Sequence, residues 1–187
     1  VVIVTSGPGA TNVITGVADA MTDSTPVVVI SGQVASATLG TDAFQEADII
    51  GLTGPITKWN YQIRRAEDVA WAVSRAFYIA STGRPGPVVL DFTKDAQVGL
   101  TDFEFRKCSF IRSYVPELPV PMEEVARAAE LIDKAERPMV VYGQGVILGG
   151  AEKALAEFIE KGDIPAASTL LGLAALPSSS RLYQGMI

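Results

Sequence analysis

The sequence predicts an α/β fold in which a parallel sheet has helices on both faces. Two segments, Pro26 to Ile30 and Pro87 to Phe92, are apolar almost throughout and do not alternate as half-buried strands do. The region between them includes residues 67–80, where apolar side chains recur at helical spacing. Strands that are buried on both faces need helices above and below them, which is typical of parallel sheets.

Turn residues and hydrophobic spacing divide the first half of the chain into further elements. A strand is expected over 1–5 and a helix over 10–21, with a short helix-like stretch over 44–50 and a weakly alternating strand over 59–63. The helix over 67–80 is the clearest, because Glu67 and Asp68 lie in its first turn and Gly83 and Pro85 follow its end.

Periodicity fails between residues 96 and 121, where Pro116, Pro119 and Pro121 accumulate. We interpret this stretch as an interdomain linker. A second α/β unit is expected to follow, with a helix from Glu123, strands over 138–142 and 164–168, and a helix over 151–161. The predicted organisation is therefore a first domain over 1–95, a linker over 96–121 and an incomplete second domain over 122–187, since two strands rarely make a stable sheet.

Composition excludes several classes of function. The net charge of −6 and the lack of a basic cluster argue against a nucleic-acid partner. The longest apolar runs are far shorter than the roughly 20 residues that cross a bilayer, so no membrane association is expected. The chain has no histidine and one cysteine, Cys108, which excludes Ser-His and Cys-His nucleophile pairs and predicts no metal site within it.

Three glycine turns and one arginine are candidates for binding, each with a structural alternative. The turn Gly7-Pro8-Gly9 leads into a helix, but it lacks a phosphate-loop ending and is as consistent with a plain tight turn. Gln45 follows the Gly40 turn, and its residue type alone favours a helix cap or a surface amide over a binding role. Gly143-Gln144-Gly145 follows a strand, yet its third glycine, Gly149, comes one residue late for a dinucleotide fingerprint. Arg84 suits a phosphate or a flavin ring, and equally a carboxylate or solvent.

Taken together, the segments 6–12 and 40–46 resemble the acetohydroxyacid synthase family of thiamine-diphosphate enzymes. The similarity continues through Ile56-Thr57-Lys58, 84–87, 94–95 and 169–173. It implies that residues 1–95 are the C-terminal part of the pyrimidine-side thiamine-diphosphate domain. Residues 122–187 would then be the N-terminal part of a Rossmann-like central domain associated with FAD, and the chain an internal piece of a longer protein.

The resemblance also implies roles for individual residues. A substrate and thiamine pocket is expected to include Pro8, Gly9, Asn12, Phe44, Gln45, Lys58 and Lys94. FAD is expected to contact Ser24, Arg84, Gly143, Gln144, Gly145, Thr169 and Leu170. Two departures stand out: residues 35–37 lack the proline and arginines common after Gly-Gln-Val, and Gln144 adds a side chain where the family usually has none.

The family joins pyruvate to a second 2-keto acid, pyruvate or 2-ketobutyrate, with loss of carbon dioxide, in branched-chain amino-acid biosynthesis. It uses thiamine diphosphate, Mg²⁺ and FAD, and forms homodimers or homotetramers, in some cases with a small regulatory subunit. It is cytoplasmic in bacteria and plastid or mitochondrial in eukaryotes. The family glutamate that activates thiamine would precede Val1, and the metal motif would follow Ile187. No catalytic residue is therefore assigned here, and we expect the 187 residues alone to be inactive.

Two other functional hypotheses remain open at this point. The first is another thiamine-diphosphate carboligase or oxidase, of the glyoxylate carboligase or pyruvate oxidase type. The second is a non-catalytic flavin- or nucleotide-binding module, which the Gly143 turn alone would permit.

Overall fold

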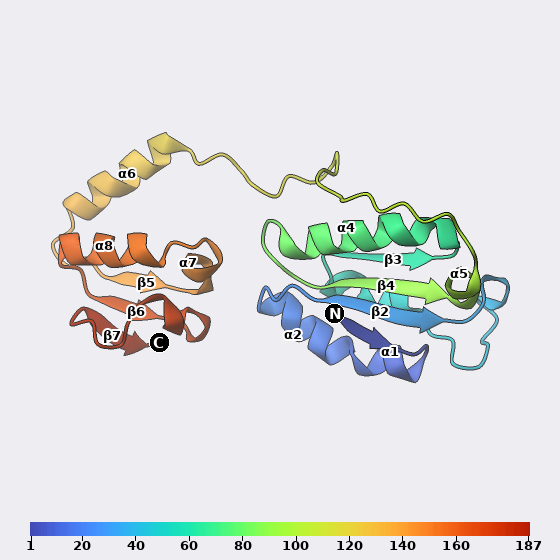
Figure 1. Cartoon of the computed structure of the whole chain (residues 1–187). Helices are drawn as coiled ribbons and strands as arrows, with labels where there is room; N and C mark the ends of the chain where they lie inside the picture. The colour runs from blue at the N-terminus through green and yellow to red at the C-terminus, as the bar shows by residue number, and fades with distance from the viewer. The chain divides into compact units, whose positions relative to one another are not determined.

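A computed structural model describes residues 1–187 and divides them into two compact units, Val1–Leu118 and Pro119–Ile187. Each unit has its own sheet, as Figure 1 shows, and its own buried core, and each is described by itself. None of the helices combines the length and the apolar character that a bilayer span requires.

Unit 1 contains a four-stranded sheet in the order β1-β2-β4-β3. The strands are β1 (Val2–Val4), β2 (Val28–Gln33), β3 (Trp59–Ile63) and β4 (Val88–Thr93). Every pairing is parallel, and Leu90 of β4 lies opposite Ile30 on one side and Tyr61 on the other. This confirms the predicted α/β class, and it brings the carboxyl ends of all four strands to one edge of the sheet.

Helices cover both faces of this sheet, as predicted (Figure 1). The helices of unit 1 are α1 (Pro8–Asn12), α2 (Ile14–Thr22), α3 (Ile49–Thr53), α4 (Val69–Ser81) and α5 (Lys94–Val98). On β4, Val88 and Leu90 pack into the core beneath α4, whereas Val89 packs with Val17 and Ile49 of the opposite layer. Each such side chain stabilises the fold by about 1.5–3 kcal/mol when it is fully buried.

Two local expectations differ from the structure. The helix expected over 10–21 is interrupted at Val13, which separates α1 from α2. The helix expected over 44–50 begins only at Ile49, where the Asp48 carboxylate accepts a hydrogen bond of 2.9 Å from the Gly51 amide. Asp42 and Gln45 have φ angles of 57° and 62°, and this left-handed backbone cannot continue a right-handed helix.

The stretch expected as a linker is held against α4 by a few of its residues. The Cys108 amide donates to the Ser74 hydroxyl at 2.7 Å, and Ile111 is buried in the core beneath α4. The compact units divide after Leu118, so residues 96–118 belong to unit 1. The segment has no regular periodicity because its contacts come from single side chains along an extended path.

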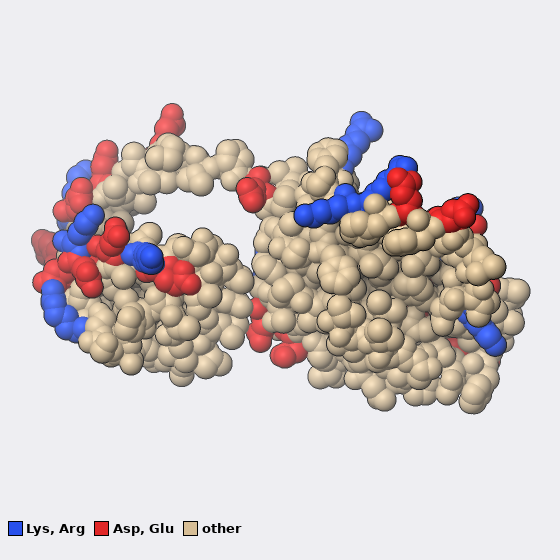
Figure 2. Space-filling model, viewed as in Figure 1, with Lys and Arg blue, Asp and Glu red and all other residues tan.

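Unit 2 has a parallel sheet in the order β5-β6-β7. Its elements are α6 (Met122–Asp133), β5 (Val140–Tyr142), α7 (Gln144–Leu148), α8 (Glu152–Gly162), β6 (Ala166–Ser168) and β7 (Tyr183–Met186). Ile159 of α8 is fully buried against Ala166 and Leu182, while α6 buries no residue. Charged side chains of both signs gather over α6 and α8 in Figure 2. The strand β7 was not predicted.

Lys58 joins the segment 96–118 to the end of α4. Its ammonium group donates to the carbonyls of Ile79 and Thr82, the latter at 2.7 Å, and to the Tyr114 hydroxyl at 3.0 Å. An ammonium group has three N–H donors, so all of them are used. The positive charge also lies at the carboxyl end of a helix, where the dipole favours it.

We predict that Lys58→Met lowers the free energy of unfolding of unit 1 by about 1–3 kcal/mol, because methionine keeps the aliphatic stem and loses charge-assisted hydrogen bonds. Urea unfolding measures this loss, and limited proteolysis between residues 108 and 114 should become faster. The matched control is Lys94→Met, an exposed lysine elsewhere in the unit, with an expected change below about 0.5 kcal/mol. Equal stability of the two variants would contradict a stabilising role of the Lys58 hydrogen bonds.

Candidate functional site

A hollow of about 380 Å³ lies at the carboxyl edge of the sheet in unit 1. It is formed where β1, β2 and β4 end, which is where ligand sites of open parallel sheets usually lie. Its lining includes apolar side chains, hydroxyl groups and one cation: Ile3, Thr5, Ser6, Ile30, Gly32, Gln33, Phe92 and Lys94. Of the predicted pocket residues, Lys94 lines this hollow directly.

The two motifs singled out in the sequence meet beside this hollow. Gly7 has a φ of 55°, and a Cβ added to it would lie 2.6 Å from the carbonyl oxygen of Gln45. The backbone of the 6–12 turn therefore contacts the backbone of the 40–46 segment. Only glycine permits both this conformation and this approach without strain. Pro8 and Gly9 follow directly as the first residues of α1.

Glu46 holds the 40–46 segment in its looped shape. Its carboxylate accepts hydrogen bonds from the amides of Gly40 and Ala43, the second at 3.0 Å. These backbone bonds, with Gly40 the larger contributor, lower the pKa of Glu46 below its ordinary value. The loop presents Phe44, which is 89% exposed, and Gln45, which is also exposed. Asn12, at the end of α1, is exposed as well.

A second hollow, of about 690 Å³, lies on the β3 side of the same loop. Most of its lining residues have polar side chains, among them Gln33, Glu46, Asp48, Asn60, Gln62 and Arg64. Gln33 lines both hollows although it is only 5% exposed. Its side chain is therefore part of the wall between them.

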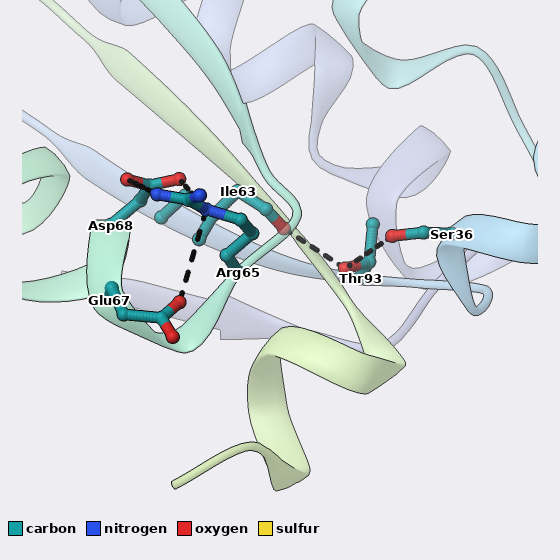
Figure 3. A network of polar contacts seen from close by, with 6 residues as sticks. All are labelled: Ser36, Ile63, Arg65, Glu67, Asp68 and Thr93. Carbon is teal, nitrogen blue, oxygen red and sulfur yellow. Dashed lines mark hydrogen bonds and ion pairs between the residues drawn. The ribbon is translucent and has the colours of Figure 1, made fainter. Parts of the chain in front are cut away.

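Hydrogen bonds tie the strand ends together along this edge, as Figure 3 shows. The Ser36 hydroxyl donates to Thr93 Oγ1 at 3.3 Å, and the Thr93 hydroxyl donates to the Ile63 carbonyl at 3.1 Å. The Ser36 amide also donates to the Asp95 carboxylate at 2.8 Å. That backbone bond is the main reason why the pKa of Asp95 falls from 3.8 to about 2, with the Ser36 side chain second.

The charged groups just beyond β3 form a separate cluster, which Figure 3 also shows. Arg65 Nε lies 3.4 Å from the Asp68 carboxylate and 3.9 Å from the Glu67 carboxylate. The Arg65 and Glu67 side chains are mostly exposed, so these pairs add little stability. They offset the charge of Arg65.

Three other predicted residues lie at the opposite, amino edge of the sheet. Lys58 precedes β3, Arg84 precedes β4 and Ser24 precedes β2. Arg84 Nε donates to the Ser24 hydroxyl at 2.7 Å, and its Nη2 donates to the Thr22 carbonyl at 2.9 Å. The structure thus pairs the two residues expected at FAD in this unit, and it separates Lys58 from Lys94, Phe44 and Gln45.

The predicted residues of unit 2 cluster where β5 and β6 end. Gly143 and Thr169 are adjacent, since a Cβ added to Gly143 would lie 3.1 Å from Thr169 Oγ1. Gln144 and Gly145 open the short helix α7, and Leu170 is 66% exposed. The turn and the segment after β6 therefore form one edge of this sheet.

Two protein-family models match the chain, and both describe thiamine pyrophosphate enzymes. The N-terminal TPP binding domain matches residues 1–52, which include both turns that meet at Gly7 and Gln45. The central domain matches residues 125–187. The chain belongs to the thiamine pyrophosphate enzymes. Its first 52 residues are part of the domain of this family that binds the cofactor.

Curated relatives within this family are similar along the whole chain. An acetolactate synthase large subunit of Corynebacterium glutamicum is 45% identical over 186 residues, and one of Lactococcus lactis is 43% identical over 187 residues. Isozyme 3 of Escherichia coli is 40% identical over 189 residues. Each match covers 100% of this chain but only 30–33% of the relative, so the chain spans about a third of their length.

For several residues of the carboxyl edge, no role in the site was predicted from the sequence. Gln33, Glu46 and Asp95 shape the site through side-chain bonds to backbone amides or carbonyls. Asp91 offered a signal, because it is a carboxylate inside the apolar strand 87–92. Gln33, the last residue of β2, offered none, since its partners are far away in sequence.

We predict that Gly7→Ala displaces the 40–46 loop, because its Cβ would overlap the Gln45 carbonyl and its φ is positive. Amide hydrogen exchange of residues 40–46 should become at least about tenfold faster, and the melting temperature should fall. Gly16→Ala is the control: a Cβ there meets nothing within 4 Å, and alanine in helix α2 should stabilise by about 0.5–1 kcal/mol. Unchanged exchange in Gly7→Ala would contradict the contact.

We predict that the Asp95 carboxylate contributes to the stability of unit 1 and that this contribution is lost in acid. Its folded pKa of about 2 lies below the ordinary 3.8, so the contribution is present above about pH 4 and is lost as pH falls through about 2. Asp95→Asn keeps an acceptor for the Ser36 amide and removes the charge, so its deficit in unfolding free energy should be larger at about pH 5 than at about pH 2. Ser36→Ala retains the amide and should keep most of the pH dependence; a pH-independent deficit in Asp95→Asn would refute the assignment.

Proposed function

We propose that this chain is part of an acetolactate synthase large subunit, which condenses pyruvate with a second 2-keto acid and releases carbon dioxide. The observation that supports this most is the identity of 40–45% to acetolactate synthase large subunits over all or nearly all of the chain. The contact between the Gly7 turn and the Gln45 loop, beside a hollow at the carboxyl edge, supports a ligand site at this place.

The carboxyl edge of unit 1 fits an uncharged heteroaromatic ring such as the pyrimidine of thiamine. Phe92, Ile3 and Ile30 supply apolar walls, and Thr5 and Ser6 supply hydroxyl and backbone groups. A mostly apolar lining with a few polar groups is typical of cofactor sites. Thiamine diphosphate, when bound, supplies the electron sink that a 2-keto acid needs to lose carbon dioxide.

The residues of this chain would bind and orient the substrates. Lys94 places a cation at the hollow, where it would attract the carboxylate of a keto acid. Gln45 offers an amide that can donate to a carbonyl oxygen, and Phe44 would exclude water from one side. Pro8, Gly9 and Asn12 lie on the turn and helix that adjoin Gln45, so they complete this proposed pocket.

Mg²⁺ and FAD are also part of the proposal, with different support. No group of three or more acidic, histidine or cysteine side chains in this chain could hold a metal ion, so Mg²⁺ would need ligands from elsewhere in the complete protein. For FAD, Arg84 is the proposed contact in unit 1, where its Nε and Nη2 donate to Ser24 and to the end of α2. In unit 2, the edge made by Gly143, Gln144, Gly145, Thr169 and Leu170 is the proposed flavin contact.

The proposal extends to assembly and location. A homodimer or homotetramer, with a small regulatory subunit, would match the family, and so would 2-keto acids as the substrates. The cytoplasm of a bacterium, or the plastid or mitochondrion of a eukaryote, would be the compartment.

The test uses the complete protein and measures acetolactate formed from pyruvate. Gln45→Gly should lower turnover roughly 100-fold, because it removes the amide and suits the φ of 62° without strain. Gln45→Asn keeps a shorter amide, tolerates the same backbone, and should retain more activity than the glycine variant.

Each other outcome of that test contradicts a defined part of the proposal. Carboligation of glyoxylate, or oxidation of pyruvate by oxygen, without acetolactate would point to another thiamine-diphosphate enzyme. Flavin absorbance with no turnover of any keto acid would point to a flavin-binding module. Equal activity of wild type and Gln45→Gly would remove Gln45 from the site.

A further inference from the structure

Asp91 is a carboxylate at the centre of the sheet in unit 1. It lies on β4 opposite Ser31 of β2 and Gln62 of β3, and it is 0% exposed. Every other fully buried polar side chain in the chain is neutral. Burial raises the pKa of Asp91, so ionising this group opposes folding.

Amide groups from both neighbouring strands donate to the same oxygen of Asp91. Gln62 Nε2 lies 2.9 Å and Gln33 Nε2 lies 3.2 Å from Oδ2, while Oδ1 has no hydrogen-bond partner. An unpartnered buried polar atom costs about 1–3 kcal/mol. Apolar residues often replace buried ionic groups with equal or greater stability, so stability alone does not account for a carboxylate here.

Gln33 links Asp91 to the 40–46 loop through hydrogen bonds. Its Nε2 also donates to the Ala47 carbonyl at 2.9 Å, and its Oε1 accepts from the Val34 amide at 2.9 Å. These bonds fix both ends of the amide, so Gln33 can hold Ala47 in one place only. Ala47 directly follows Glu46, whose carboxylate shapes the loop that contains Gln45.

We propose that Asp91 is a positioning residue: through Gln33 it anchors Ala47 and so holds the Phe44–Gln45 loop against the Gly7 turn. The effect on turnover rests on the proposed acetolactate synthase function, whereas the effect on the loop does not. A displacement of about 1 Å at a substrate-orienting group can cost up to about 100-fold in rate. Asp91 acts through Gln33 and does not itself contact the substrate.

The experiment compares three variants of the complete protein. Asp91→Asn keeps an oxygen for both glutamine amides, Asp91→Ala removes it, and Leu90→Ala perturbs the adjacent residue, whose side chain packs toward α4. Hydrogen exchange of amides 40–47 is measured with the melting temperature and with kcat and KM for acetolactate formation.

We expect Asp91→Ala to speed exchange over residues 40–47 by at least about tenfold and to lower kcat by about tenfold or more with a smaller change in KM. In Asp91→Asn, the exchange rates over residues 40–47 and kcat should stay within about threefold of the wild-type values. Leu90→Ala should lower the melting temperature at least as much as Asp91→Ala does, but it should not selectively speed exchange over residues 40–47.

Two results would overturn the inference. One is unchanged exchange over residues 40–47 in Asp91→Ala; the other is equal loosening of the loop in Leu90→Ala. If the complete protein makes no acetolactate at all, the proposed function fails, and the exchange comparison still decides whether Asp91 positions the loop.

Discussion

The contact between the Gly7 backbone and the Gln45 carbonyl is the constraint on which the candidate site depends. It joins the turn after β1 to the loop after β2, and parallel pairing brings both to the same edge of the sheet. Two left-handed residues, Gly7 and Gln45, are needed for it. A left-handed glutamine is uncommon, and such a backbone persists only where surrounding bonds hold it. Glu46 on one side and Gln33 with Ala47 on the other supply those bonds.

The two edges of the sheet in unit 1 use their charged groups in different ways. At the amino edge, Lys58 and Arg84 donate to carbonyls at the ends of α4 and α2, where the helix dipole favours positive charge. At the carboxyl edge, acidic groups accept from backbone amides, as Asp95 and Glu46 do. One edge therefore stabilises the helices, while the other shapes loops around two hollows and leaves Lys94 exposed there.

The strands and α4 could be predicted from the sequence because burial on both faces leaves long apolar runs, as in 87–92. The path of 41–48 could not, since the positive φ angles of Asp42 and Gln45 arise from tertiary bonds and not from local preference. Residues 96–118 have no periodicity, yet the Cys108 amide binds Ser74 of α4, and the Tyr114 hydroxyl binds Lys58 and Thr82 at the end of α4. Of the candidate site, the two glycine turns were visible in the sequence, and the buried Asp91–Gln33 network that supports them was not.

The most direct test of the account is the distance between the two motifs in solution. In an isotopically labelled sample, nuclear Overhauser spectroscopy measures contacts between the α protons of Gly7 and the α proton of Gln45. The structure places a Cβ built on Gly7 within 3.0 Å of Gln45 Cα, so a strong cross-peak between these protons is predicted. Cross-peaks from Gly7 to its sequence neighbours alone, with none to residues 43–46, would contradict a site built from these two turns.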